Sequence, residues 1–437
     1  MASPWWKKLV EKPVDLAQAF QRSADAKKLD WLVVGGGPCG TCAVGALLQR
    51  GGASVGWVSK TPWEAMGWLG DFGEVPANTR NDRLVAAFES VDAFDFAAAQ
   101  KRRGAAGLAA APPAATAPLR LSLDALLDAS AAMRAGGRLG LARDGVLVHS
   151  LIQREDGWDA ECGVGDVVCR ATRVLLATGG APREASPELR AALEARGVFV
   201  IDLPLALAPD AATKRAEATI DALACAVRGV RVAVIGGAHS GMLAAKNCAA
   251  RGADVCVYDL AGEPRYAEER DGWIKRDGTG LKGAVAAWTR TAVGTSIGYE
   301  TLDAAADPES VAARLAADGA EAIIYAAGFA PATPPDVFVP GTNTRDYAED
   351  IVQVDFPETA GRRGALYGGS IFGAGLAYPE VWTDPDGDAE PRVGFVGHYL
   401  AHLGRIFDAA DEAEAPPAKK KKKKKREKKR ARAASDA

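Results

Sequence analysis

Two glycine-rich segments, about two hundred residues apart, constrain the fold of this chain more than any other feature. Residues 31–40 read WLVVGGGPCG and residues 231–241 read RVAVIGGAHSG. Each segment joins an apolar run to a run of small residues, as a strand–turn–helix unit does. Such a unit holds the diphosphate of a dinucleotide on free N–H groups at the N-terminus of the helix. Two units in matching contexts therefore predict two dinucleotides held face to face.

The alternation of strand-like and helix-like segments predicts an α/β fold with parallel sheets covered by helices on both faces. We expect two Rossmann-like dinucleotide-binding domains, the second inserted into the first. A lead-in helix and linker are predicted over 1–29 and a disordered basic tail over 411–437. Domain one is predicted to comprise 30–180 and 341–410, and domain two 181–340.

Within this frame the local patterns give four further predictions. The Ala- and Pro-rich residues 97–118 predict a loop insertion, and residues 120–177 predict short strands, for example 145–149 and 166–170. Residues 364–376 predict a strand that enters a tight turn. A final helix is expected over about 394–410.

The charge distribution separates the C-terminal tail from the rest. The chain carries a net charge of −3, yet residues 419–432 contain twelve Lys and Arg and a single acid. The remaining chain is therefore acidic and is not expected to bind nucleic acid. The tail predicts disorder, and it has three interpretations: a signal that binds an import receptor, a tether to an anionic surface, or a solvated appendage.

Other bulk features bear on the compartment. No apolar run is long enough to span a membrane, and residues 1–9 lack the pattern of a secretory signal. Seven cysteines without framework spacing fit a reducing compartment. We therefore expect a cytoplasmic protein, or a nuclear one if the tail acts as an import signal.

The two turns differ at one of their three glycine positions. Gly35, Gly37 and Gly40 match the pattern in full, whereas the second turn has an alanine, Ala238, between Gly236 and Gly241. The middle position is where the backbone approaches the diphosphate most closely. Ala238 adds a methyl group there, which weakens or displaces the bound phosphates.

The second strand of each unit gives the opposite contrast. Aligning residues 50–55 with residues 251–255 places Ser59 opposite Asp259. An acid at this strand end hydrogen-bonds a ribose hydroxyl and repels a 2′-phosphate, so Asp259 favours NADH over NADPH. Arg265, close by in the sequence, complicates this assignment because an arginine can accommodate the 2′-phosphate. In the first unit, Ser59 can donate to a ribose oxygen and Lys60 can reach a phosphate.

These motifs resemble those of the two-dinucleotide-binding-domain flavoproteins, which include pyridine nucleotide-disulfide oxidoreductases and flavin-dependent monooxygenases. The resemblance rests on residues 33–40, 175–179, 234–241 and 324–329, and it covers roughly residues 30–410. It implies FAD in domain one and NADH or NADPH in domain two. It also implies that the strand ends at Thr178-Gly179 and Gly328 are the crossings between the domains. The candidate cofactor-binding residues are Gly35, Gly37, Pro38, Gly40, Ser59, Lys60, Thr178, Gly179, Gly236, Ala238, His239, Ser240, Gly241, Asp259 and Gly328.

The chain departs from the disulfide reductases of this group. Residues 60–70 contain no cysteine, and domain two has only Cys248 and Cys256 after its turn. Cys39 and Cys42 form a Cys-x-x-Cys, but the resemblance places packing residues there. Three functions stay open: an FAD-dependent oxidoreductase reduced by NAD(P)H, a flavin-dependent monooxygenase, and a non-catalytic nucleotide-binding scaffold. The substrate is expected to be a small molecule, and no catalytic side chain is identified.

A few other residues carry possible chemistry. His398 and His402 have a spacing that can hold zinc, but no acid or cysteine completes a site nearby in the sequence, so no metal is expected. His239 either contacts the nicotinamide cofactor or caps its helix. Residues 271–283 form either a substrate lid or a solvent loop. Residues 367–375 are expected to return to the flavin, although they lack the usual Asp.

Overall fold

The computed structural model describes residues 26–73, 75, 77, 79–163, 166–207, 222–270, 273–277, 279–303, 306–340, 351–353, 365–367, 370–392 and 395–414. Most of the predicted lead-in segment and nearly all of the predicted basic tail lie outside these residues. Among the described helices, none combines the length and the hydropathy needed to span a bilayer.

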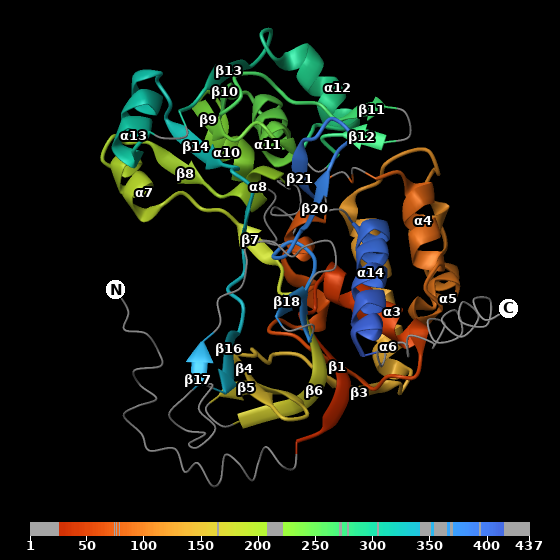
Figure 1. Cartoon of the computed structure of the whole chain (residues 1–437). Helices are drawn as coiled ribbons and strands as arrows, with labels where there is room; N and C mark the ends of the chain where they lie inside the picture. The colour runs from red at the N-terminus through yellow and green to blue at the C-terminus, as the bar shows by residue number, and fades with distance from the viewer. Residues whose placement is uncertain are drawn as a thin grey trace, which may run out of the picture.

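A ten-stranded mixed sheet forms the larger unit (Figure 1). Its main path runs β17-β16-β4-β5-β6-β1-β2-β3, and β19 pairs with β6 and with β18. The bounds are β1 Lys28–Val34, β2 Val55–Val58, β3 Leu139–Arg143, β4 Ser150–Arg154, β5 Gly157–Gly163, β6 Asp166–Leu176, β16 Asp336–Pro340, β17 Ile351–Gln353, β18 Ala365–Tyr367 and β19 Ile371–Gly373. Strands β6, β1, β2 and β3 are parallel neighbours, which places their carboxyl ends at one edge.

Five helices cover one face of this parallel part: α3 Pro38–Arg50, α4 Asn81–Glu89, α5 Phe96–Arg103, α6 Leu119–Ala135 and α14 Val396–Glu414. A core between α3, α6, α14 and the sheet includes Val44, Leu126 and Phe407, each at most 1% exposed. Short 3-10 turns connect these elements at Trp63–Ala65, Gly67–Phe72, Asp92–Phe94, Gly104–Ala106 and Leu108–Ala110.

A five-stranded parallel sheet with the order β13-β10-β9-β14-β8 forms the smaller unit. Its strands are β8 Phe199–Ile201, β9 Arg231–Ile235, β10 Asp254–Asp259, β13 Gly298–Thr301 and β14 Ala322–Tyr325. Its helices are α7 Pro187–Glu194, α8 Leu203–Leu207, α10 Ala222–Val227, α11 His239–Ala249, α12 Gly283–Ala292 and α13 Pro308–Ala317.

The side chains of this smaller sheet alternate between two cores. Val232 and Val234 pack with α8, α10, α11 and α12, while Ala233 and Ile235 pack with α7 and α13. Alternate residues of a strand point to opposite faces, so a strand that is apolar throughout is buried on both. The predicted α/β fold with helices on both faces of a parallel sheet is confirmed.

The chain leaves the large sheet after β6 and returns to it at β16, so the smaller unit is an insertion, as predicted. The crossings are β7 Gly180–Pro182 and β15 Phe329–Pro331, which pair antiparallel. A side chain at Gly180 would collide with the carbonyl oxygen of Ala330, so the close approach of the two crossings requires glycine. The domain limits at 180 and 340 stay predictions, and β16 already belongs to the large sheet before residue 340.

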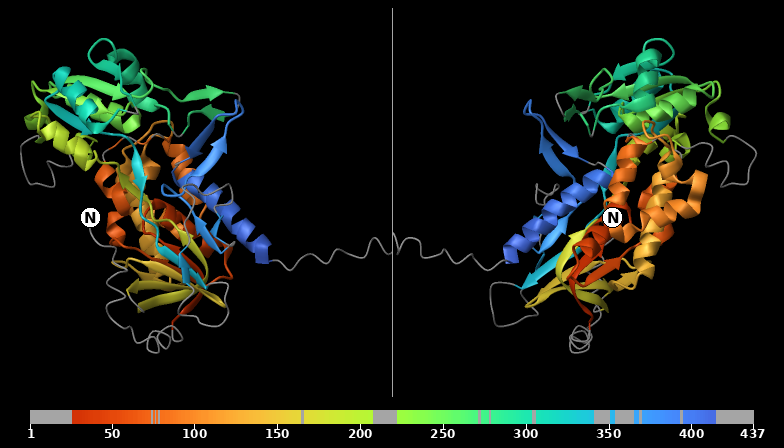
Figure 2. Two further views of the ribbon diagram at one scale, coloured as in Figure 1. Left: turned by 60° about the vertical axis from the view of Figure 1, so that its left-hand side comes forward. Right: turned by 90° about the vertical axis from the view of Figure 1, so that its right-hand side faces the viewer.

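Two hairpins make a second connection between the units (Figure 2). The hairpin of β20 Glu380–Thr383 and β21 Ala389–Arg392 extends from the larger unit toward β11 Glu268–Arg270 and β12 Trp273–Lys275 of the smaller one. Lys275 Nζ lies 2.6 Å from Asp386 Oδ2, and the Asp277 amide donates to Glu390.

Three local predictions were wrong. Residues 119–135 form helix α6 rather than strands, because Leu123, Leu126 and Met133 recur at helical spacing and are buried. Residues 97–103 belong to helix α5 rather than to a loop, and residues 145–149 form no strand. The strand over 166–170 is confirmed within β6, and the final helix runs four residues further than predicted.

Candidate cofactor-binding site

At two positions of the first turn, the surrounding backbone leaves no room for a side chain, so only glycine fits. Gly35 follows β1 with φ +130°, and a side chain there would collide with the carbonyl oxygen of Ala177. A side chain at Gly40 would collide with the carbonyl oxygen of Gly35. The indole nitrogen of Trp57 donates to that same oxygen at 2.9 Å, which holds the turn against β2. These contacts bring the N-terminus of α3 directly onto the end of β1.

Gly37 differs from both, because nothing in the protein requires glycine there. It is the N-cap of α3 with φ −79° and ψ −174°, a conformation open to any residue. A side-chain carbon would come no closer than 3.8 Å to any other atom, the carbonyl oxygen of Met66. Pro38 begins the helix, where its missing N–H costs nothing. The bare N-terminus at Gly37 therefore leaves space for a ligand, as a diphosphate cradle requires.

The second turn repeats this geometry. Gly236 has φ +112°, and a side chain there would collide with the carbonyl oxygen of Ala326, while Gly241 is held against Gly236. Ala238 is the N-cap of α11 with φ −78° and ψ −174°, the backbone conformation of Gly37. Its methyl group is exposed and stands where the first turn is bare. The two turns therefore have the same backbone conformation and differ in the space that they leave for a ligand.

The strand registers place Ser59 and Asp259 at equivalent positions. Val34 pairs with Val58 in the first unit, and Ile235 pairs with Tyr258 in the second. Ser59 and Asp259 are therefore each the next residue after a paired strand end. The alignment predicted from sequence is correct in register.

The two side chains are engaged differently. Asp259 accepts hydrogen bonds from the Gly237 amide at 3.2 Å and from the Ala261 amide at 3.3 Å, so it orders the second turn. Each of its oxygens keeps a second lone pair for a ribose hydroxyl. Ser59 is buried and donates to the carbonyl oxygen of Thr61 at 2.7 Å, so its proton is not directed at a ligand. Lys60 beside it is exposed.

His239 begins α11, close enough to Lys282, the N-cap of α12, to be affected by its charge. Both of its ring nitrogens are buried and make no hydrogen bond within the described part of the chain. Burial, with a smaller contribution from the Lys282 charge, lowers the pKa of His239 to about 4. His239 therefore makes no capping hydrogen bond to the described residues, and its contact with a nicotinamide cofactor stays a prediction. Ser240 follows in the first turn of the helix and is half-buried.

The crossings and the closing strand gather at the edge of the large sheet that carries the first turn. Gly179 and Gly328 both have positive φ, +70° and +82°. Strand β19 pairs with β6, and Gly375 beyond it packs onto Cys39 at the start of α3. Tyr378 follows, and burial raises its pKa to about 12, offset in part by the hydroxyl of Thr178. Residues 371–375 thus lie beside the first turn, and their contact with a flavin stays a prediction.

The cysteines lack the properties of a redox pair. All seven are free thiols, and Cys39 and Cys42 are buried in the core behind the first turn. Burial raises the pKa of Cys39 to about 12 and that of Cys42 well above its usual range. Reactive cysteines have depressed pKa values and partial exposure. Their role is packing, as the sequence analysis expected.

One cluster of potential metal ligands joins residues that are far apart in the sequence. Glu380 of β20 lies beside His398 and His402 of α14, and one ligand atom from each lies within 4.8 Å of the others. No acid or cysteine that is near these histidines in the sequence completes a site, and the structure brings Glu380 to them from a distant element. Glu380 is eighteen residues from His398, on a different element, so no local spacing pattern could reveal it.

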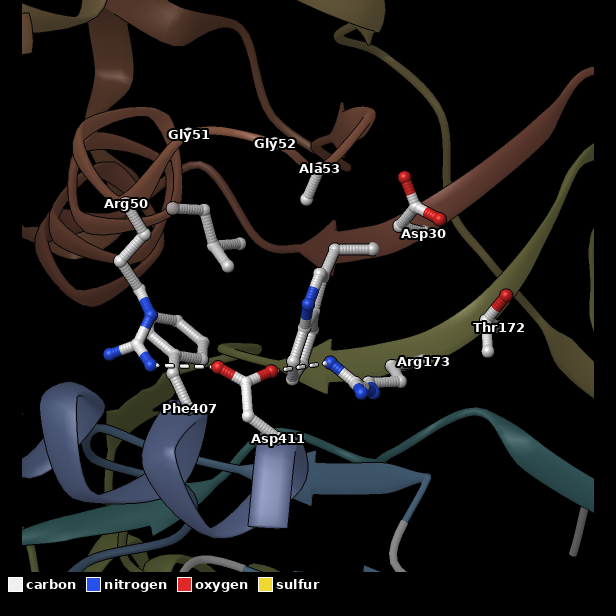
Figure 3. Close-up of a pocket in the computed structure, with 11 residues that line it drawn as sticks. Asp30, Arg50, Gly51, Gly52, Ala53, Thr172, Arg173, Phe407 and Asp411 are labelled. Atoms are coloured by element: carbon white, nitrogen blue, oxygen red, sulfur yellow. Dashed lines mark hydrogen bonds and ion pairs between the residues drawn. The ribbon is translucent and has the colours of Figure 1, made fainter. Parts of the chain in front are cut away.

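Figure 3 shows a pocket of about 560 Å³ whose lining includes residues of β1, α3 and α14. Its walls include Asp30 and Trp31, at the amino-terminal part of β1, whereas Gly35 follows the carboxyl end of that strand. Asp411 bridges Arg50 and Arg173 across it at 2.8 and 3.1 Å. Because no residue of either glycine turn lines it, this pocket is separate from the candidate cofactor site.

Comparisons with known proteins agree with this geometry. No family model matches the chain. Monooxygenase AgnR1 of Paecilomyces divaricatus is 28% identical over 409 residues, which are 83% of this chain and 93% of that protein. The solved ornithine N-hydroxylase KtzI of Kutzneria sp. 744, with reduced FAD, NADP⁺ and ornithine, has a TM-score of 0.55 and 14% identity, covering 89% of this chain and all of that one.

A flavin monooxygenase from Stenotrophomonas maltophilia has a TM-score of 0.54 and 16% identity, with coverage of 89% of this chain and 99% of that one. These findings agree with the predicted oxidoreductase class and with the predicted FAD and nicotinamide cofactors, and a reductase and a monooxygenase fit them equally well. The chain has the fold of the two-dinucleotide-binding-domain flavoproteins, as its sequence motifs predicted.

Proposed function

We propose that this chain is an FAD-dependent oxidoreductase reduced by NAD(P)H and that it acts as a monooxygenase on a small molecule. The observation that carries the proposal is the bare N-cap at Gly37. The protein does not need glycine there, and the same backbone position in the second unit bears a methyl group. A ligand that approaches the backbone closely, such as the diphosphate of FAD, explains why a side chain is absent.

The residues divide between the two cofactors. Gly35, Gly37, Pro38 and Gly40 would hold the FAD diphosphate, with Thr178 and Gly179 at the adjoining strand end. The second turn, from Gly236 to Gly241, would hold the nicotinamide cofactor, with Asp259 accepting from its ribose. When both are bound, these cofactors supply hydride transfer and the reduction of oxygen.

The thiol chemistry favours the monooxygenase over a disulfide reductase. A disulfide reductase needs a reactive cysteine pair beside the flavin, and Cys39 and Cys42 are buried with raised pKa values. The relative of 28% identity, which spans most of this chain, is itself named a monooxygenase.

The visible spectrum of the purified chain tests the proposal directly. We expect a flavin band that bleaches on anaerobic addition of NADH or NADPH and returns when oxygen is admitted. Oxygen uptake should rise with a suitable small-molecule substrate, and hydrogen peroxide release should fall as that substrate is hydroxylated. A protein that stays colourless after incubation with FAD and removal of free flavin would overturn the proposal and favour a non-catalytic scaffold.

The basic segment supports a separate proposal about location. Residues 419–432 lie outside the described residues, and their twelve basic side chains suit an import receptor. We expect a fluorescent protein that carries residues 411–437 to accumulate in the nucleus of a eukaryotic cell. A uniform distribution, unchanged when the lysines are replaced by glutamine, would leave the cytoplasm as the proposed location.

A further inference from the structure

We propose that Glu380, His398 and His402 form a binding site for a divalent transition-metal ion, with Zn²⁺ as the ion that suits it best. One ring nitrogen of each histidine and one carboxylate oxygen lie within 4.8 Å of one another. Two imidazoles and a carboxylate are a ligand set that zinc uses, with a fourth position open to water. The site is separate from both glycine turns.

The local structure explains why the two histidines meet. Residues four apart on a helix lie one above the other on the same face. His398 and His402 do so on α14, with ring centroids 6.2 Å apart. Glu380, the first residue of β20, lies beside this pair, with a carboxylate oxygen 3.9 Å from His398 Nε2.

The burial of these groups is the second observation that points to a ligand. His402 is 2% exposed and Glu380 is 7% exposed. The Nε2 atoms of His398 and His402 are buried and make no hydrogen bond to any residue that the structure describes. A buried polar atom without a partner is costly, and a metal ion bound by both imidazoles would remove that cost.

The distances require only a small adjustment. Zinc–ligand bonds of about 2.0–2.2 Å place tetrahedral ligand atoms roughly 3.4 Å apart. The cluster must therefore close by about 1.5 Å at most, a change that requires rotation of the histidine side chains as well as that of Glu380. The ion would then join α14 to the hairpin of β20 and β21 and stiffen the connection between the two units.

The positive charge of Arg405 and its hydrogen bonds to Glu380 oppose the binding of a metal ion. Its guanidinium lies 2.7 and 2.8 Å from the two carboxylate oxygens of Glu380, and Arg392 adds a second positive charge near His398. The charges that favour a cation are Glu380 and, from the smaller unit, Asp277. Because the Arg405 side chain is 47% exposed, it can turn into solvent when a metal ion takes the carboxylate. Metal affinity should therefore rise when Arg405 is removed.

Titration of the full chain with Co²⁺, after treatment with a chelator, tests the site. We expect one equivalent to bind with the intense visible bands of four-coordinate cobalt, and Zn²⁺ to displace it. His398→Gln and His402→Gln should each abolish these bands. Arg405→Gln should tighten binding by about tenfold or more, the scale of changes next to metal ligands. His149→Gln, which changes an exposed histidine next to the start of β4, is the matched control and should bind as the unmodified chain does.

Thermal unfolding gives a second measurement that does not depend on the spectrum. Zn²⁺ should raise the Tm of the unmodified chain and of His149→Gln, but not that of folded His402→Gln. The site is refuted if no stoichiometric Co²⁺ binds, if the spectrum is the faint one of six-coordinate cobalt, or if the double variant of His398 and His402 binds as well as the control. FAD content is expected to be the same in all variants, so failure here is distinct from failure of the proposed function.

Discussion

Gly37 and Ala238 have the same backbone conformation, within one degree in φ and identical in ψ, at the N-caps of α3 and α11. One position is bare and the other carries a methyl group. The two units thus offer the same cradle with different amounts of space at its closest point. The first suits a tightly held cofactor, and the second suits one that binds and leaves.

Exchanging these two residues tests that difference. Gly37→Ala should weaken FAD retention by about tenfold or more, because a methyl group intrudes where the diphosphate approaches, an overpacking cost of about 1–3 kcal/mol. Flavin-to-protein ratios after gel filtration measure it. Unfolding of the apoprotein should be unchanged, since the new carbon stays 3.8 Å from its nearest neighbour. Ala238→Gly, the reciprocal variant, should leave FAD unchanged and lower the KM for the nicotinamide cofactor; equal FAD retention in both variants would contradict this account.

Asp259 should set the choice of nicotinamide cofactor. We expect the unmodified chain to prefer NADH, because a carboxylate repels the 2′-phosphate of NADPH. Asp259→Asn keeps an oxygen to accept from the Gly237 amide but removes the charge. The ratio of kcat/KM for NADPH to that for NADH should rise by about tenfold, or roughly 1.4 kcal/mol. Asp254→Asn, at the exposed start of the same strand, is the control; a ratio that moves equally in both variants would remove Asp259 from this role.

The buried thiols should be dispensable for electron transfer. Cys39→Ala and Cys42→Ala should leave the rate of flavin reduction by NAD(P)H within about twofold. Cys42→Ala should cost roughly 1–2 kcal/mol of unfolding free energy through the small cavity it leaves. Iodoacetamide should label exposed Cys225 in the folded protein and spare Cys39, as mass spectrometry can show. Loss of flavin reduction in a well-folded Cys39→Ala variant would reopen the disulfide reductase hypothesis.

His239 should make folding less stable in mild acid. Its folded pKa, about 4, lies below the value of 6.5 for an unperturbed histidine. As the pH falls below 6.5, the unfolded chain takes up a proton that the folded chain refuses, so stability falls until the pH reaches about 4. Between pH 7 and pH 5 the loss should be about 1–2 kcal/mol. Urea unfolding of His239→Asn should show a correspondingly shallower pH slope than His149→Asn, and identical slopes would contradict the prediction.

Much of the fold was predictable because its signals are local. A strand, a glycine turn and a helix are encoded within about ten residues, as at 31–40 and 231–241. The equivalence of Ser59 and Asp259 followed from counting residues along parallel strands. Helix α6 was missed for the opposite reason, because neighbouring strand-like segments outweighed the spacing of Leu123, Leu126 and Met133.

The site was predictable only in part. The sequence located both turns and their glycines, but the engagement of Ser59 with Thr61 and the position of Lys282 beside His239 emerged only in three dimensions. Each depends on how a loop or a neighbouring helix packs over the turn. Such packing depends on side chains from several elements at once, and no spacing rule along one segment records it.

The two strand–turn–helix units, their order and the insertion of one within the other can all be inferred from residues a few positions apart, because each feature has a local signal in the chain. Which residues from distant parts of the sequence come into contact can be seen only in the folded structure. Glu380 meets His398 and His402 only because the first residue of β20 lies beside helix α14 in the folded chain. Gly375 meets Cys39 only because a late strand returns beside β6. Contacts of this kind form when segments that are far apart in the sequence pack against one another. Such packing depends on the whole chain and not on any one segment.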